Sequence, residues 1–461
     1  MTEKHNLPRA TGHPSDHVHT VVIVGAGLAG LTAAKMFYHA EIDVVVLEAE
    51  NRPGGRLKTD RFEGFLLDHG FQVYLTNYQT ACQFVDLASL KLQSFRPGAM
   101  IRCGNTWHTF KDPLRSSWSK MIPDALKTIA SPIATWEDFW ILLRYRQSLS
   151  KLNSMQVLER PGEPTIERLK KLGFSQRIID RFFRPFLGGI FLDDRLDIDS
   201  SRMEFVFREM GLGTAALPEQ GIQAIPESIC RTIGSNIVRY NSTVSKVFEG
   251  GVELSDGTKV LGRNVILAVE PSGAKRLLGD TLPIPAKLSS RSTTCLYFSM
   301  ETCAAPTREP ILFLNGNLGT EGDSKDQSQI DGLTINHVAF PSLVQPSYAP
   351  SGQVLASVNI NSASQLRGAE LVHHVQQQLV QWFGWTVSTW KHLRTYHVPC
   401  AFLSPSLPLL DTSNRGYFRL SENLYACGDY TQSSSIEGAI HSGMLVATAM
   451  LTGADSSRCL I

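Results

Sequence analysis

The sequence predicts an α/β fold in which a domain built on a parallel sheet is interrupted by a second, α+β domain. A strand–turn–helix–strand unit begins at residue 21, and a strand–turn–helix unit closes the chain after residue 423. Segments with a different pattern lie between these units. With 461 residues, the chain is too long for one simple core and fits two domains of ordinary size.

The opening unit starts with an unbroken run of Val and Ile, residues 21–24. Such a run indicates a strand buried in a parallel sheet, because a strand with one face in water would alternate. It is followed by a complete G-x-G-x-x-G, Gly25-Ala26-Gly27-Leu28-Ala29-Gly30. In this pattern the first glycine allows a tight turn and the second lets backbone approach a pyrophosphate. The third lets the following helix pack closely.

The rest of this unit completes a Rossmann-like pattern. A helix is expected over residues 28–40, with its free N–H groups and positive dipole end facing phosphates. A second apolar strand, residues 44–47, ends at Glu48, whose carboxylate can accept hydrogen bonds from ribose hydroxyls. The ordered unit predicts dinucleotide binding.

A second glycine pair follows in Arg52-Pro53-Gly54-Gly55-Arg56, which a simple NAD site does not require. Together, VVIVGAGLAGLTAA and VLEAENRPGGR resemble the N-terminal signature of the FAD-dependent amine oxidase superfamily. That superfamily also contains protoporphyrinogen oxidases and carotenoid desaturases. The resemblance implies FAD, with Glu48 on the adenosine ribose and the Gly54-Gly55-Arg56 turn beside the pyrophosphate and flavin.

A segment similar to the superfamily's D-x-G stretch follows at residues 66–74. By that resemblance, Gly70, Phe71 and Gln72 line the reactive face of the flavin, which makes Phe71 and Gln72 the candidate catalytic residues. The alternative is that Asp68 and His69 only cap a turn. His69 as a general base is a further option.

The closing unit is a short strand, the Gly428-Asp429 turn and a helix that opens with serines 434 and 435, which can cap its free N–H groups. A helix N-terminus at the flavin's pyrimidine edge would stabilise negative charge on the reduced ring. Asp429 is expected to bind a ribityl hydroxyl or to order the pyrophosphate.

In detail, G-D-Y-T followed by S-I-E-G-A resembles plant and cyanobacterial-type carotene desaturases, with a shorter spacer. In monoamine oxidases a cage tyrosine stands two residues before the matching glutamate, and here that position is Ser435. This departure favours desaturation over amine oxidation. The covalent-flavin cysteine pattern is also missing, so non-covalent FAD is expected.

The resemblance also extends to a middle segment, in which the backbone of Val244 would contact the adenine. The cofactor-binding residues expected in total are Gly25, Gly27, Leu28, Ala29, Gly30, Glu48, Ala49, Arg52, Gly54, Gly55, Arg56, Gly70, Val244, Gly428, Asp429, Ser435, Ile436 and Ala439.

The predicted organisation is a Rossmann-like FAD-binding domain with an inserted α+β substrate domain that contains a mixed or antiparallel sheet and a helical cap. The FAD domain would comprise residues 20–89, 203–288 and 401–455. The substrate domain would comprise 90–202 and 289–400, with strands at 295–300, 311–314, 333–340 and 354–360 and a helix at 368–383.

Two segments leave alternatives open. Aromatic and basic residues within 118–190 fit either a helical cap or a patch for peripheral membrane contact. Residues 1–19 carry four histidines and fit a disordered extension better than a metal-binding arm, since no acid or cysteine partner is evident. No metal site is predicted.

Composition limits the classes of partner that the chain is expected to bind. A formal net charge of +1 gives no basic excess of the kind that binds nucleic acid. The sequence also has no run of 18 apolar residues that could span a membrane. Eight cysteines without a C-x-x-C pair indicate reduced thiols, as in a cytoplasmic protein.

The expected function is an FAD-dependent oxidoreductase that removes hydride from a C–H bond of a small-molecule, hydrophobic substrate of carotenoid or tetrapyrrole type. The alternatives are an amine oxidase that releases peroxide, an NAD-dependent dehydrogenase, and a non-catalytic prenyl-group carrier similar to the Rab-GDP dissociation inhibitors.

Overall fold

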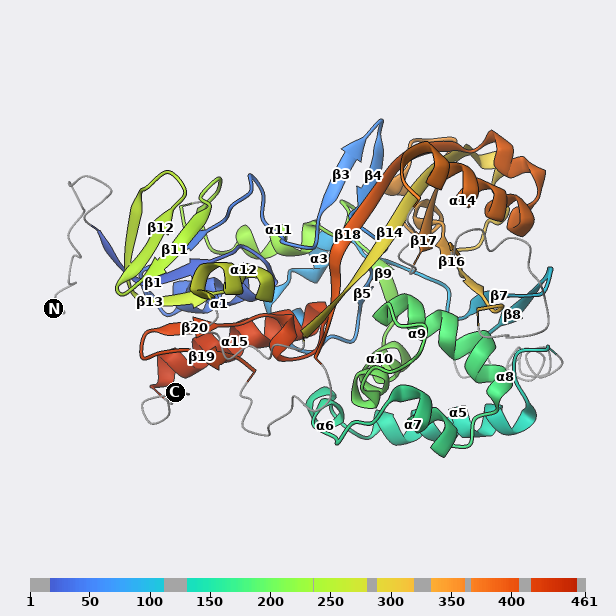
Figure 1. The fold of residues 1–461 in the computed structure, drawn as a ribbon, viewed down its shortest axis with the longest axis horizontal. Coiled ribbons are helices and arrows are strands. Elements are labelled where there is room, and N and C mark those ends of the chain that lie inside the picture. Colours follow the sequence, from blue (N-terminus) through green and yellow to red (C-terminus); the bar gives the residue numbers. More distant parts are fainter. Residues whose placement is uncertain are drawn as a thin grey trace.

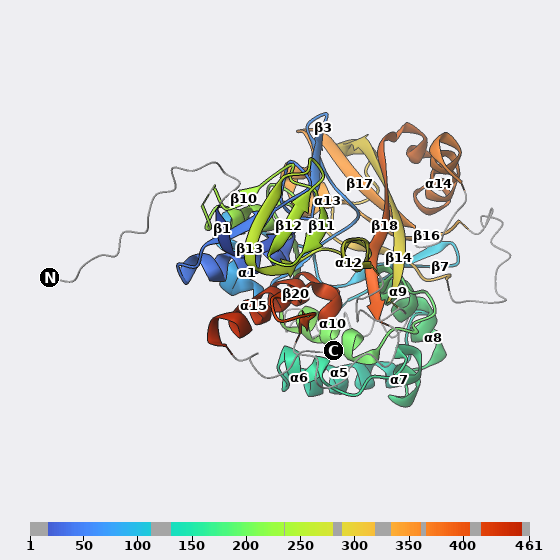
Figure 2. The same ribbon diagram turned by 60° about the vertical axis from the view of Figure 1, so that its left-hand side comes forward.

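The computed structural model describes residues 17–111, 131–234, 236–279, 288–318, 333–360, 366–405 and 416–453. Two sheets dominate this part of the chain, and a group of helices lies beneath the second (Figures 1 and 2). The predicted mixed α/β fold is confirmed.

The first sheet has eight strands in the order β10-β2-β1-β13-β12-β11, with β20 on β13 and β19 on β20. β1 runs parallel to both β2 and β13. This central position explains the unbroken apolar run of β1, because neither face of the strand meets water. The strands are β1 (Val18–Val24), β2 (Val44–Leu47), β10 (Val238–Arg239), β11 (Val244–Phe248), β12 (Gly251–Leu254), β13 (Lys259–Leu267), β19 (Phe418–Arg419) and β20 (Leu424–Ala426).

The first strand begins earlier than expected, since Val18 and His19 belong to β1 and not to an extension. The side chains of His17 and His19 both contact Asp43, at 2.9 and 3.2 Å. Asp43 lies just before β2, the parallel neighbour of β1, so pairing of the two strands supplies the acid partner that the sequence did not reveal. A ring nitrogen of each histidine and a carboxylate oxygen of Asp43 lie within 4.8 Å of one another.

Helices from both ends of the chain pack together beside the first sheet (Figure 1). Gly443 makes this close approach possible, because a Cβ there would lie 2.1 Å from the carbonyl oxygen of Ala29. The C-terminal unit is thereby held against the glycine loop. The helices around this sheet are α1 (Leu28–His39), α11 (Ala224–Cys230), α12 (Pro271–Leu278) and α15 (Ile436–Thr452).

The second sheet is mixed, in the order β18-β14-β17-β16-β15-β7-β8, with only β15 and β7 parallel. α14 (Gly368–Phe383) covers one face with its apolar side, within the bounds expected from the sequence. The strands are β7 (Ala99–Cys103), β8 (Thr106–Phe110), β14 (Leu288–Glu301), β15 (Leu312–Asn315), β16 (Ile335–Ala339), β17 (Gln353–Ile360) and β18 (Lys391–Pro405).

β14 and β18 form a long antiparallel ribbon that runs diagonally across the molecule in Figure 1. β18 was not among the expected strands, and the predicted boundary at residues 400/401 falls inside it. The alternating pattern of β18 is broken by Pro399 and by register shifts in its pairing with β14, which explains why the sequence conceals it.

The helical cap consists of α5 (Trp136–Ser150), α6 (Ser154–Leu158), α7 (Thr165–Lys171), α8 (Gln176–Ile178), the π-helical turn η2 (Ile179–Phe183), α9 (Arg184–Phe191) and α10 (Ser200–Leu212). Residues 112–130, which include the first part of the proposed aromatic patch, lie outside the described residues. On α5, the side chains of Trp136 and Trp140 remain 49% and 42% exposed. Within the described ranges, no helix is long and apolar enough to cross a membrane.

Short elements complete the structure. β3 (Thr59–Phe62) and β4 (Phe65–Asp68) form a hairpin, and a small sheet contains β5 (Tyr74–Leu75), β9 (Ala215–Leu217) and β6 (Gln93–Ser94). The remaining short helices are α2 (Ala81–Phe84), α3 (Leu87–Leu90) and α13 (Pro341–Val344), with 3₁₀ turns at Thr302–Ala304, Pro346–Tyr348, Trp385–Thr389 and Asp429–Thr431.

Candidate functional site

A cavity of about 880 Å³ extends from the first sheet to the second sheet and the cap. Sixteen of the eighteen residues predicted to bind cofactor line it, and so do Phe71 and Gln72. The sixteen are Gly25, Gly27, Leu28, Ala29, Glu48, Ala49, Gly54, Gly55, Arg56, Gly70, Val244, Gly428, Asp429, Ser435, Ile436 and Ala439.

Backbone from two glycine turns forms one end of this cavity. Gly54 donates its N–H to the carbonyl of Ala26 at 2.9 Å, which ties the second turn to the first. An added Cβ at Gly27 would meet nothing within 4 Å, and one at Gly55 would face only the Cα of Gly27. The two turns therefore leave a gap bordered by bare backbone, which suits a group that binds through N–H donors.

Glu48 lies beside this gap at the end of β2. Its carboxylate accepts hydrogen bonds from the N–H groups of Ala26, at 2.7 Å, and Glu50, at 3.0 Å. These bonds hold the buried carboxylate in one orientation. Each oxygen keeps a second lone pair for another donor, such as a sugar hydroxyl.

Asp429, in the C-terminal strand–turn–helix unit, borders the same gap. Its carboxylate pairs with the guanidinium of Arg56, with an Nη2–Oδ1 distance of 2.5 Å. The Gly428 N–H donates to the hydroxyl of Ser442 on α15, at 2.9 Å, which fixes the turn to that helix. Burial lowers the pKa of Arg56, but the charge of Asp429 outweighs this and raises it above its ordinary value.

The helix α15 begins at the cavity with Ser435 as its N-cap. The Ser435 hydroxyl accepts a hydrogen bond from the Gly438 N–H at 3.0 Å. Ser434, the other serine expected to cap, instead donates to the carbonyl of Leu403 in β18, at 2.5 Å. Of the two serines, only Ser435 has the extended backbone of an N-cap followed directly by the helix.

The side-chain amide of Gln72 forms hydrogen bonds to the protein backbone. Its amide nitrogen donates to the backbone carbonyls of Arg56, at 3.1 Å, and His69, at 3.0 Å. It therefore joins the second glycine turn to the segment before Phe71. The Phe71 ring contacts Phe95 and His337, with ring centroids 5.8 and 5.3 Å apart.

The far wall of the cavity is apolar. We call this surface the apolar wall; it consists of Phe71, Phe95, Phe186, Ile190, Leu312 and Leu314. Strand alternation explains its origin, because Leu312 and Leu314 of β15 face the cavity while Phe313 packs under α14. The segment 181–190 contributes Phe186 and Ile190 to it.

The chain was compared with known proteins. The family model of flavin containing amine oxidoreductases matches residues 28–451. The chain belongs to this family. FAD is therefore its cofactor, and the protein is an FAD-dependent oxidoreductase.

Two curated relatives and one solved structure are similar to the chain. Coproporphyrinogen III oxidase from Propionibacterium freudenreichii is 24% identical over 411 residues, covering 76% of this chain and 73% of that protein. L-amino acid oxidase Lm29 from Lachesis muta is 35% identical over 271 residues, covering 54% and 48%. The solved structure of cyclohexylamine oxidase from Brevibacterium oxydans shares the fold, with a TM-score of 0.67, 14% identity, and coverage of 95% and 100%.

The donor set at the gap fits FAD. An open backbone cradle at Gly27 and Gly55 matches a diphosphate, and the fixed carboxylate of Glu48 matches a ribose. Val244 lines the cavity next to a register shift in β11, between Val244 and Lys246. The geometry of this end of the cavity therefore agrees with the FAD cofactor that membership of the family implies.

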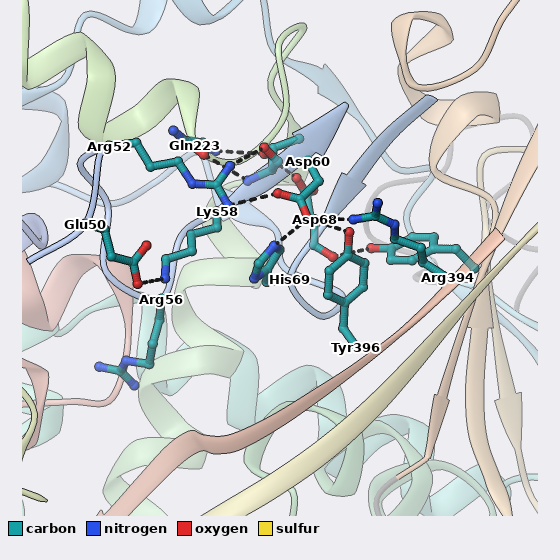
Figure 3. Close-up of polar contacts among 12 residues, drawn as sticks. Glu50, Arg52, Arg56, Lys58, Asp60, Asp68, His69, Gln223, Arg394 and Tyr396 are labelled. Carbon is teal, nitrogen blue, oxygen red and sulfur yellow. Dashed lines mark hydrogen bonds and ion pairs between the residues drawn. The ribbon is translucent and has the colours of Figure 1, made fainter. Parts of the chain in front are cut away.

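Two predicted residues, Gly30 and Arg52, do not line the cavity. A Cβ at Gly30 would lie 2.1 Å from the carbonyl oxygen of Gly25, so this glycine serves the packing of α1 on β1. Arg52 points away, to Asp60 at 2.8 Å and to the carbonyl of Thr59, whereas Arg56 points in the opposite direction (Figure 3). The side chain of Arg52 leaves the loop because Asp60 offers it a carboxylate.

His69 also belongs to the polar cluster around Asp60 (Figure 3). Burial lowers the pKa of His69, although Asp60 lies 3.1 Å from its Nε2 and opposes this effect. The pKa of Asp60 falls to about 2; burial raises it, but hydrogen bonds from Arg52 and Tyr396 and the nearby His69 ring outweigh burial. His69 also lines the cavity, so its ring lies between the cavity and the Asp60 carboxylate.

Asp68 is fully buried beneath this cluster. It accepts hydrogen bonds from Thr59, Tyr348 and the Ile222 N–H, at 2.6, 2.8 and 3.1 Å. Burial raises its pKa to about 6 despite these bonds. These contacts join β4 to β3, to Tyr348 and to the turn before α11.

The polar residues that line the cavity and that sequence reasoning missed include His337 and Arg202. His337 Nδ1 donates to Oδ1 of Asn336 at 2.7 Å, and burial lowers its pKa to about 4, so the ring is neutral. The alternation of β16 could have placed His337 on one face of the sheet, but not which face meets the cavity. Nothing in the local pattern marked Arg202.

Proposed function

We propose that this chain uses FAD to desaturate a large, mainly apolar substrate of the tetrapyrrole or carotenoid type. The observation that carries the proposal is the continuity of one cavity from the glycine cradle to the apolar wall. Such a cavity brings a substrate C–H bond against the cofactor in a site with little water.

A bound FAD would supply the acceptor for the hydride equivalent, and the second hydrogen of the new double bond would leave as a proton to water. The chain's own residues hold and orient. Gly25, Gly27, Gly54 and Gly55 offer backbone to the diphosphate, and Glu48 accepts from the adenosine ribose. Arg56 and Asp429 together border the middle of the cofactor.

At the flavin, the N-terminus of α15 supplies a positive dipole end, with Ile436 and Ala439 as its cavity-facing residues. Phe71 presents an apolar surface, and Gln72 acts through backbone carbonyls to position it. In this proposal no side chain is required as an obligatory acid or base.

The domain division remains part of the proposal. Residues 20–89, 203–288 and 401–455 would hold FAD, while 90–202 and 289–400 would hold substrate. The β14–β18 ribbon supports close coupling between them, since each strand runs across or beside a proposed boundary.

The tetrapyrrole class is supported by the relatives whose names specify coproporphyrinogen III, from Propionibacterium freudenreichii and Staphylococcus aureus. Amine oxidation is the second candidate, favoured by the 35% identity to an L-amino acid oxidase. Ser435 at the position of the cage tyrosine argues against it.

The test is anaerobic reduction of the bound flavin by candidate substrates, measured as the loss of the flavin's visible absorbance. Coproporphyrinogen III, protoporphyrinogen IX, phytoene, benzylamine and L-leucine are added separately to purified holoprotein. We expect bleaching by a porphyrinogen or by phytoene. Bleaching by benzylamine or L-leucine alone would overturn the proposal in favour of amine oxidation.

A further inference from the structure

Arg202 is a buried cation in the cavity wall, without an ion-pair partner among the residues that the structure describes. It lies in the first turn of α10, is 7% exposed and lines the cavity. Its Nη1 is fully buried and forms no hydrogen bond, and no described residue forms an ion pair with its guanidinium. The main-chain N–H of Arg202, by contrast, is bonded to Asp199.

The nearby acids are engaged elsewhere. The carboxylate of Asp199 caps α10 by accepting the Ser201 N–H at 2.8 Å. Asp429 is paired with Arg56 at 2.5 Å. Burial lowers the pKa of Arg202, and the charges of Asp199 and Asp429 oppose this effect only from a distance.

A second arginine on the same helix shows how a structural cation is satisfied. Arg208 is 5% exposed, pairs with Glu209 at 2.6 Å, and also donates to Ser154 and to the Leu152 carbonyl. It does not line the cavity. Burial of an unpaired charge is unfavourable, and Arg202 lacks the compensating contacts within the described residues that Arg208 has.

A guanidinium with free donors matches the paired oxygens of a carboxylate or a phosphate, and it repels a cationic amine. We propose that Arg202 is an anion-binding subsite of this cavity, which takes an oxyanion carried in by a ligand. Two sources share this chemistry: a carboxylate of the substrate and the diphosphate of FAD.

The substrate source deepens the proposed function and rests on it. A carboxylate at Arg202 selects an acid-bearing substrate, such as a tetrapyrrole with carboxylate side chains, over a neutral polyene. The cofactor source does not depend on the identity of the substrate.

The experiment compares R202M, R202K and, as a matched control, R208M. The melting temperature of each apoprotein is measured first. R202M is expected to melt at or above the wild-type temperature, since it removes an uncompensated charge. R208M is expected to melt lower because Glu209 loses its partner. A drop for R202M as large as that for R208M would make Arg202 a structural residue and overturn the proposal.

Binding is then measured for three probes: FAD with the apoproteins, and coproporphyrin III and its tetramethyl ester with the holoproteins. The proposal predicts that R202M weakens binding of FAD or of coproporphyrin III by about tenfold or more, with R202K intermediate. Loss for FAD assigns the oxyanion to the diphosphate. Loss for coproporphyrin III, with the ester unaffected, assigns it to a substrate carboxylate.

The two proposals fail in different ways. If the wild-type holoprotein binds neither porphyrin, the tetrapyrrole assignment fails, and FAD affinity alone decides the role of Arg202. Unchanged affinity of R202M for every probe that the wild type binds would overturn the anion subsite.

Discussion

The guanidinium of Arg56 and the carboxylate of Asp429 form an ion pair across the cavity wall, with 2.5 Å between Nη2 and Oδ1. One residue follows the second glycine turn near the start of the chain, and the other lies in the last strand–turn–helix unit. The Asp429 side chain is 6% exposed and that of Arg56 is 29% exposed, so the carboxylate is the shielded member of the pair. The pair fixes the distance between the two turns that border the cavity.

Replacement of Arg56 by Met should therefore separate the two ends of the site. Asp429 would be left as a buried carboxylate without its partner, which costs about 1–3 kcal/mol. We expect a lower melting temperature and weaker FAD binding, both measured on the purified variant. R56K keeps the charge and should lie between wild type and R56M; equal FAD affinity in all three proteins would contradict this role.

Two glycines allow cofactor binding and folding to be separated. G27A adds a Cβ that meets no protein atom within 4 Å, at a backbone φ of −73° that alanine adopts easily. Its apoprotein should melt like wild type, while FAD binding is lost because the methyl group fills the diphosphate approach.

G443A should show the opposite order of effects. Its Cβ would lie 2.1 Å from the Ala29 carbonyl oxygen, so α1 and α15 must move apart, at a cost of about 1–3 kcal/mol. Calorimetry of both apoproteins distinguishes the variants. A destabilised G27A would contradict the open space beside Gly27, and a G443A with wild-type stability would contradict the close contact between α1 and α15.

Asp60 makes stability depend on pH in the acid range. Its folded pKa of about 2 lies below the ordinary value of 3.8, so its contribution is complete above pH 4 and is lost as pH falls toward 2. D60N should lower the unfolding free energy near pH 7 by roughly 1–2 kcal/mol and flatten its slope between pH 4 and 2. Denaturant unfolding at several pH values measures both. An unchanged slope would show that the Asp60 cluster has no net effect, and Y396F, which removes one donor, should give a smaller change.

Gln72 should affect the chemistry through position. Its amide nitrogen bonds the carbonyls of Arg56 and His69, so Q72L would free the segment that presents Phe71. We expect slower flavin reduction by substrate, by about tenfold, with nearly normal FAD affinity. Q72E keeps the length but lacks the amide donor and should behave like Q72L. Wild-type rates of flavin reduction in both variants would show that Gln72 does not position Phe71 for the reaction.

The parts of the fold that follow local rules could be predicted from the sequence. Residues 21–48 show strand, glycine turn, helix and strand in register, and β2 has the expected bounds. The period of α14 likewise revealed its helix and buried face. In both segments local pattern and final packing agree, so short-range reasoning succeeds.

The parts that depend on partners distant in the sequence could not be predicted. Arg52 lies in the same loop as Arg56, but its side chain pairs with the carboxylate of Asp60 and lies outside the cavity. Asp43 becomes the partner of His17 and His19 only through strand pairing. The isolation of Arg202 is a property of its three-dimensional neighbours, which no spacing in the sequence encodes.

The most direct measurement is the dissociation constant of FAD for apoproteins that are altered at opposite ends of the chain. E48Q changes the residue that we place on the adenosine ribose, and D429N changes the residue that we place near the middle of the cofactor. Circular dichroism first establishes that both variants are folded. If both ends of the chain hold one FAD molecule, each variant should bind FAD about tenfold or more weakly than wild type. Wild-type affinity in either folded variant would contradict that arrangement.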